Sequence, residues 1–189
     1  MKKLTLTILF VFGIYTMQAQ TYFGVKVGAN YTSFRGDVEQ ISYKPSFHVG
    51  GVSEISINDS FSFQPEILYS VQGYQSKDDA SLKTNYNYIQ VPLMLKYFVK
   101  DLVTLDGGPQ VGYLISTTQT NGYEEIIGDQ KEFSNSLDYG FNLGVTYEMD
   151  SGIFLQARYN FGFANVLKKE TNAKAYNSVM QISMGYKFY

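Results

Sequence analysis

The fold of this chain is decided by one stretch, 88-YIQVPLMLKYF-98. Apolar side chains occupy its odd-numbered positions from Ile89 to Tyr97, and Gln90, Met94 and Lys96 lie between them. A period of two residues is typical of a β-strand with one apolar and one polar face. The same alternation resumes after a short turn, so the stretch predicts two consecutive antiparallel strands.

The alternation recurs from one end of the chain to the other, with Gly, Ser, Asn and Gln common on the polar face. It predicts eight strands, at residues 22–34, 46–57, 61–74, 88–98, 103–115, 136–149, 153–163 and 177–189. Pro65, Pro92 and Pro109 fall inside three of them. Because proline cannot donate a ladder hydrogen bond, each removes one bond or lies at a bulge.

The connections between the predicted strands alternate between long and short. Long ones follow the first, third, fifth and seventh strands, and short ones follow the second, fourth and sixth. Transmembrane barrels of the bacterial outer membrane have this asymmetry, with short periplasmic turns and longer outer loops. The pattern predicts an all-β fold, an eight-stranded antiparallel up-and-down transmembrane β-barrel with both termini in the periplasm.

The first twenty residues read as an export signal. Lys2 and Lys3 precede a mostly apolar run at residues 4–15, and Ala19 offers a cleavage site. The run is short for a membrane-spanning helix, which needs roughly 20 residues. We therefore expect a cleavable signal peptide at 1–19 and a single barrel domain at 20–189.

Composition narrows the function classes. The chain has 17 Tyr and 14 Phe but no Trp and no Cys, which excludes disulfides and thiolate metal sites. Its net charge of −2 becomes −4 when the two lysines of the signal peptide are removed. A charge this mild predicts no nucleic-acid partner.

The apolar face must point outward. About five bulky apolar groups on each of eight strands exceed what the interior of an eight-stranded barrel can hold. Aromatic residues also fall near both ends of the strands, as interfacial girdles require. The expected girdle residues are Tyr31, Phe34, Phe47, Tyr69 and Tyr139 at one end, and Phe23, Phe61, Phe63, Tyr97, Tyr147, Tyr186 and Phe188 at the other.

Several segments carry a resemblance to a known family. They are 88-YIQVPLMLKY-97, 107-GGPQVGY-113 and the terminal 185-GYKF-188, together with 138-DYG-140 and 157-ARY-159. The mature chain resembles the small outer-membrane β-barrel family whose members are labelled porin-family or PorT-like proteins. The resemblance implies fold and location rather than an activity. Tyr189 follows Phe188, so either aromatic residue could act as the terminal insertion signal.

Charged residues on the inward face are the main candidate site. The expected lumen charge cluster consists of Lys26, Glu54, Glu66, Lys96, Asp106, Asp138, Glu148, Arg158 and Lys187. Such residues could form an ion path or a catalytic carboxylate pair. The favoured interpretation is a packed plug of salt bridges, because charges buried in a narrow barrel must be paired.

Other motifs in the sequence are weaker evidence for a functional site. His48 is the only histidine, which disfavours a zinc site and leaves Asp138 as its sole catalytic companion. No helix follows Gly107-Gly108, so a phosphate-binding loop is not expected. The loop acids Glu124, Glu125 and Asp129 lack the spacing of an EF-hand. We expect no catalytic residues, no metal and no cofactor.

We therefore expect an outer-membrane barrel that is not an enzyme and acts structurally or through its four outer loops. Its expected partners are outer-membrane lipid, the barrel-assembly machinery during insertion and an extracellular ligand at the loops. The first alternative is a porin-like diffusion pore for small solutes. The second is a soluble periplasmic lipid-binding barrel, which would need no detergent to stay in solution.

Overall fold

A computed structural model describes residues 20–121, 125–126, 131, 134–168 and 173–188. The signal peptide expected at 1–19 and the acidic loop residues Glu124 and Asp129 lie outside this part, as does Tyr189. The described residues contain no helix that is long and apolar enough to cross a membrane.

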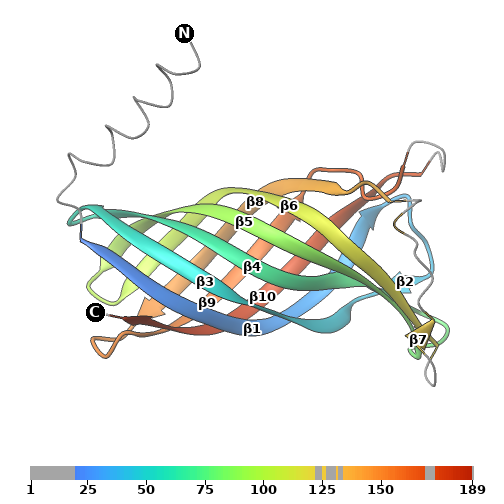
Figure 1. Cartoon of the computed structure of the whole chain (residues 1–189), viewed down its shortest axis with the longest axis horizontal. Coiled ribbons are helices and arrows are strands. Elements are labelled where there is room, and N and C mark those ends of the chain that lie inside the picture. Colours follow the sequence, from blue (N-terminus) through green and yellow to red (C-terminus); the bar gives the residue numbers. More distant parts are fainter. Residues whose placement is uncertain (1–19, 122–124, 127–130, 132–133, 169–172, 189) are drawn as a thin grey trace, which may run out of the picture.

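The described chain forms one antiparallel sheet that closes on itself (Figure 1). Neighbouring strands in the ring run in the order β1, β3, β4, β5, β6, β8, β9, β10, and β10 pairs again with β1. The barrel strands are β1 (Thr21–Gly36), β3 (Lys44–Asn58), β4 (Phe61–Ser76), β5 (Leu82–Lys100), β6 (Val103–Asn121), β8 (Leu137–Glu148), β9 (Ile153–Gly162) and β10 (Ala175–Phe188). The predicted eight-stranded up-and-down barrel is confirmed.

Two short strands add to the ring at one end. β2 (Ile41–Ser42) pairs with β4, and β7 (Glu125–Ile126) pairs with β6. The hairpin of β5 and β6 is also longer than the sequence pattern predicts, because β5 begins at Leu82 and β6 continues to Asn121. The pairing of these strands shifts by one residue between Asn87 and Tyr88, which interrupts the alternation on which the predicted boundaries rested.

The two ends of the barrel differ. The end called here the turn end carries both ends of the described chain and the short connections at 59–60, 101–102 and 149–152. The other, the loop end, carries the connections at 37–43 and 77–81 and the described parts of the connections between β6 and β8 and between β9 and β10 (Figure 1). In the tight turn before β9, Gly152 has a φ of 87°, a conformation that glycine adopts without steric strain.

The three strand prolines lie together where the ladder is interrupted. Between β4 and β5 the paired positions pass from Pro65 and Leu93 directly to Leu68 and Gln90. Between β5 and β6 they pass from Pro92 and Gln110 to Leu95 and Gly107. Proline has no N–H to donate. Pro92, opposite Glu66, and Pro109, opposite Leu93, occupy rungs that the sheet does not form, and Pro65 is the last paired position before the first gap.

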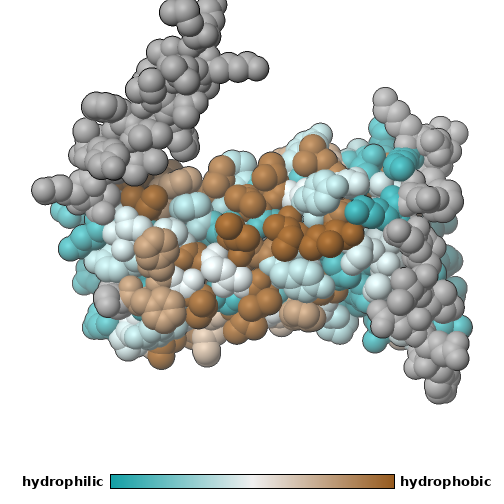
Figure 2. Space-filling model, viewed as in Figure 1, coloured by the Kyte–Doolittle hydropathy of each residue, from teal (hydrophilic) through white to brown (hydrophobic). Residues whose placement is uncertain are grey.

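The outer wall is apolar around its middle. Mid-strand side chains on this face are exposed, among them Leu143 at 53% and Ile182 at 72%. Figure 2 shows hydrophobic residues gathered over the middle of the visible wall and hydrophilic residues toward its ends. Most of the expected girdle aromatics are exposed, but Phe34 is not: only 7% of its surface is accessible, because it points into the barrel. The assignment of Phe34 to a girdle was therefore wrong.

Candidate functional site

The interior of the barrel is lined by buried polar and charged side chains. Lys26, Glu66 and Lys96 are each only 1% exposed, and Arg158 is 4% exposed. They face inward because the even-numbered positions of β1, β4, β5 and β9 alternate with apolar residues that face outward. Charges this deep need partners, so the arrangement of these partners defines the candidate site.

A middle cluster forms around Glu66. Its carboxylate accepts a hydrogen bond of 2.6 Å from Lys26 Nζ and two of 2.7 and 3.0 Å from the Arg158 guanidinium. Lys26 also donates to Gln156 Oε1 at 3.2 Å, and Gln156 Nε2 donates to Asp106 Oδ2 at 2.8 Å. The middle cluster thus holds two cations and two carboxylates, joined across the lumen from β1, β4, β6 and β9.

A second group, the mouth cluster, lies nearer the turn end. Glu54 accepts from Lys96 at 2.8 Å and from Lys187 at 2.5 Å. Glu148 accepts from Lys187 at 2.6 Å and also pairs with Lys96. Each lysine therefore contacts both carboxylates, and the four side chains form a closed ring with no net charge.

Above the middle cluster, a band of neutral hydrogen bonds crosses the lumen. His48 lies between Asn30 Oδ1, at 2.7 Å from its Nδ1, and Ser183 Oγ, at 2.8 Å from its Nε2. Gln181 Nε2 donates to the same Asn30 oxygen at 2.9 Å. The hydrogen-bond partners of His48 are therefore Asn30 and Ser183 and not Asp138, the companion that a catalytic role would have required.

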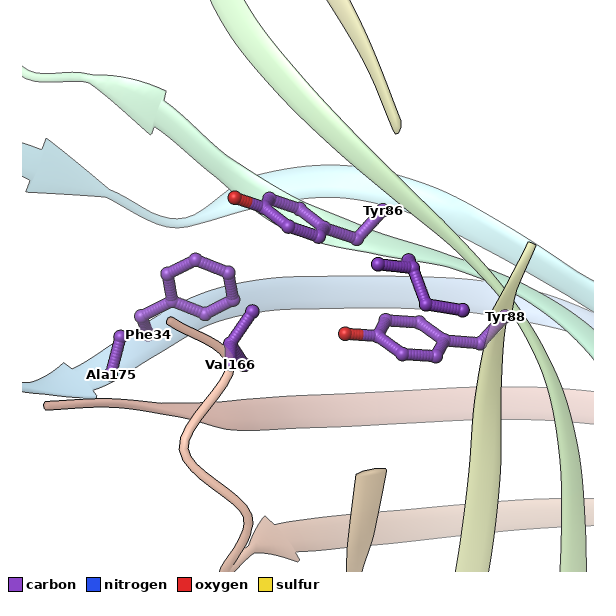
Figure 3. Close-up of a cluster of buried hydrophobic side chains, with 6 residues drawn as sticks. Phe34, Tyr86, Tyr88, Val166 and Ala175 are labelled. Atoms are coloured by element: carbon purple, nitrogen blue, oxygen red, sulfur yellow. The ribbon is translucent and has the colours of Figure 1, made fainter. Parts of the chain in front are cut away.

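Toward the loop end the lumen becomes apolar, which the sequence pattern did not predict. The outer plug consists of Phe34, Tyr86, Tyr88, Leu114, Val166 and Ala175 (Figure 3). The Phe34 ring packs against those of Tyr86 and Tyr74, each at a centroid distance of 5.3 Å. Val166 comes from the connection between β9 and β10 and is held by backbone hydrogen bonds to Asn135 and Ala175.

The structure joins eight of the nine charged residues expected in the lumen and leaves one apart. The middle and mouth clusters take Lys26, Glu66, Asp106, Arg158, Glu54, Lys96, Glu148 and Lys187. Asp138 on β8 is 2% exposed, and no cationic side chain of the described residues lies within 4.0 Å of it. No three acidic or histidine side chains of the described chain are placed to share a metal ion.

A closed antiparallel ring with an apolar exterior and a charged, hydrogen-bonded interior defines a class, the small β-barrel that spans the bacterial outer membrane. Comparison with known proteins agrees. Residues 18–168 match the family described as Outer membrane protein beta-barrel domain, and the chain belongs to it. A comparison with curated proteins gave no match.

Solved structures with the same fold include two small barrels. Neisserial surface protein A of Neisseria superposes with a TM-score of 0.59 at 16% identity, over 88% of this chain and 97% of that one. Ail, the attachment invasion locus protein of Yersinia pestis, gives a TM-score of 0.56 at 11% identity, over 89% and 99%. At these identities the likeness concerns the fold. The protein is located in the outer membrane, and the soluble periplasmic alternative is excluded.

Proposed function

We propose that this protein is a closed outer-membrane barrel that presents its loop end as an interaction surface outside the cell. The observation that carries the proposal is the interior, which is crossed by the mouth cluster, the middle cluster and the outer plug in turn. With the wall covered by lipid and the lumen filled, the loop end is the surface left for a partner outside the cell.

The form of the loop end supports this role. β5 and β6 are 19 residues long, whereas a tilted strand needs only about 9 to 11 to cross the hydrocarbon, so their hairpin projects well beyond it. The projecting part is ordered by side-chain pairs such as Asn85 with Thr118 and Asn87 with Ser116. An ordered projection loses less conformational entropy on binding than a free loop does.

The charge of the loop end does not select one ligand. Exposed cations such as Arg35, Lys77 and Lys174 alternate with the acids Asp78 and Asp79. Ail has been crystallised with the heparin analogue sucrose octasulfate, and that complex superposes on this chain with a TM-score of 0.53. This complex suggests a sulfated glycan as the first ligand with which to test binding at the loop end. No catalytic role is proposed.

The orientation of the barrel can be tested with single cysteines, because the chain has no native Cys. Ala80 lies in the loop-end connection after β4, and Ser60 and Ser151 lie in turn-end connections; all three are exposed. In intact cells, we expect an impermeant thiol reagent to label Ala80→Cys and to spare Ser60→Cys and Ser151→Cys. All three should react after the outer membrane is permeabilised. Labelling of Ser151→Cys in intact cells would reverse the topology.

Conductance in planar bilayers distinguishes the closed barrel from the porin-like alternative. We expect the wild type to give no steady conductance, because three successive layers of side chains cross its lumen. Arg158→Ala should give brief openings at most, since the mouth cluster and the outer plug remain. A large, steady wild-type conductance that Arg158→Ala leaves unchanged would favour the diffusion pore and overturn the proposal.

A further inference from the structure

The outer wall of the barrel is hollowed over β1, β10 and β9. Ala29 and Ala157 pair with Ile182 from either side, and because each alanine side chain is a single methyl group, the wall is sunken at both positions. The next row toward the loop end consists of Tyr31, Met180 and Tyr159. These six residues lie in an open hollow of about 950 Å³ with an almost wholly apolar surface, called here the wall hollow.

The same three strands become polar beyond the wall hollow. Ser33 on β1 pairs with Ser178 on β10, and both serines occupy positions of the outward register. The Tyr159 hydroxyl, at the edge of the wall hollow, shares a hydrogen bond of 2.6 Å with Ser178 Oγ. A band of hydroxyl groups therefore separates the apolar wall from the loop end.

A cation lies outside this hydroxyl band. Arg35 on β1 is exposed, and its Nη2 donates to the Gly162 carbonyl of β9 at 3.1 Å. Its guanidinium also lies 5.8 Å from the centre of the Phe161 ring, and that ring packs on Tyr159 at a centroid distance of 4.3 Å. The Arg35 side chain thus reaches across β10 on the outer face. No carboxylate of the described residues lies within 4.0 Å of it.

This order of side chains matches the order of groups in an anionic lipid. Acyl chains lie deepest in a membrane, hydrogen-bonding linkages follow, and the charged headgroup lies at the surface. Arginine suits a phosphate especially well, because its planar guanidinium can donate two parallel hydrogen bonds to the phosphate oxygens. Basic side chains at the membrane surface are a common means of holding lipid headgroups.

The width of the wall hollow indicates how many acyl chains it can hold. Its lining runs from Pro45 on β3, across β1, β10, β9 and β8, to Leu105 on β6. Five strand-to-strand steps of about 4.8 Å give an arc of roughly 24 Å. This arc offers room for more chains side by side than the two of a phospholipid.

We propose that the wall hollow and Arg35 together bind one phosphorylated glycolipid of the outer leaflet, a molecule of the lipid A class. Its several acyl chains fill the wall hollow, and one phosphate accepts hydrogen bonds from Arg35. The assignment to the outer leaflet rests on the proposed orientation, with the loop end outside the cell. Labelling that reversed the barrel would place Arg35 in the inner leaflet and would overturn the glycolipid, whatever binding is measured in detergent.

Titration of the purified barrel in detergent, read by native mass spectrometry, tests the site. The probes are lipid A, fully dephosphorylated lipid A and phosphatidylglycerol. We expect the wild type to bind one lipid A, and to bind dephosphorylated lipid A about tenfold more weakly, as the loss of a charge-assisted hydrogen bond implies. Phosphatidylglycerol should also bind more weakly, because it has only two chains. Since detergent has no sidedness, this result is independent of the orientation of the barrel.

Two variants separate the headgroup contact from the acyl contact. Arg35→Gln should weaken lipid A binding about tenfold and leave the binding of dephosphorylated lipid A unchanged. Lys77→Gln, which removes another exposed loop-end cation, is its control and should change neither. Ala157→Phe fills the wall hollow and should weaken both forms of lipid A, whereas Val111→Phe, elsewhere on the exposed wall, should not.

Equal binding of lipid A by the wild type and Arg35→Gln would overturn the headgroup contact. Equal binding by the wild type and a folded Ala157→Phe would overturn the wall hollow as the acyl site. Phosphatidylglycerol that binds as tightly as lipid A would overturn the assignment to a glycolipid. The mobility of unboiled samples on gels shows whether each variant is folded. If Ala157→Phe is not, Ala29→Leu, on the other side of Ile182, replaces it in the same comparison.

Discussion

Replacing Glu66 with alanine is expected to lower the free energy of unfolding by about 3–5 kcal/mol, which is the range for breaking a buried ion pair. Glu66 is the carboxylate that both Lys26 and Arg158 contact, at 2.6 and 2.7 Å. Its removal leaves two cations without a direct carboxylate partner inside the barrel. Any water that enters the lumen would reduce the loss toward the lower end of this range.

Substitutions of Arg158, the partner of Glu66, should lower the free energy of unfolding by less than Glu66→Ala does. Arg158→Ala leaves Glu66 paired with Lys26, so we expect a smaller loss, and Arg158→Lys a smaller one still, because it keeps the charge but not the two-point contact. Since the chain has no Trp, unfolding in detergent is best followed by circular dichroism or by the mobility of unboiled samples on gels. Glu39→Ala, in an exposed loop position, is the control and should change stability by less than about 0.5 kcal/mol. Equal losses at Glu66 and Glu39 would contradict a dry, paired cluster.

Arginine on the outer wall should be penalised according to its depth in the membrane. Ile182 is 72% exposed and lies at mid-strand, paired with Ala29 on β1 and Ala157 on β9. Ile182→Arg is expected to cost about 2–4 kcal/mol at the bilayer midplane, because hydrocarbon cannot solvate the guanidinium. The measurement is reversible unfolding of the barrel from phospholipid vesicles.

The matched control is the same substitution at a different depth. Ile57 also faces outward and is 49% exposed, but it lies one residue before the end of β3 at the turn end. Ile57→Arg should cost only about 0–1 kcal/mol, because the side chain reaches the interface. A similar penalty at both positions would mean that the wall is not graded by membrane depth, and no penalty at Ile182 would mean that it does not face lipid.

Much of the architecture could be predicted because strand alternation is local. The residues 88–98 contain their own period, and the outward assignment followed from the volume of the apolar side chains rather than from any distant contact. The ends of the strands were harder to predict from the sequence. β5 and β6 continue past the predicted boundaries because polar residues near the loop end pair across the hairpin, and a shift of register hides their alternation.

The site was less predictable because its contacts are long-range. Phe34 was taken for a girdle residue, although its even-numbered position places it with Lys26 and Asn30 inside the barrel. The outer plug also needs Val166 and Ala175, about 130 or more residues further along the chain, and alternation says nothing about which inward residues meet. For the same reason the separation of Asp138 from the other lumen charges was not foreseen.

The way the middle cluster is divided among strands has a consequence for the order of assembly. Glu66 on β4 and Arg158 on β9 are separated by four strand-to-strand steps through β5, β6 and β8. In an open sheet these steps span roughly 19 Å, at about 4.8 Å each, so the two side chains could not touch. They meet only when β10 has joined β1. Until that seam forms, Glu66 and Arg158 remain unpaired and hydrated, and their transfer into hydrocarbon is unfavourable. Closure of the ring and entry into the bilayer are therefore expected to be a single coupled event.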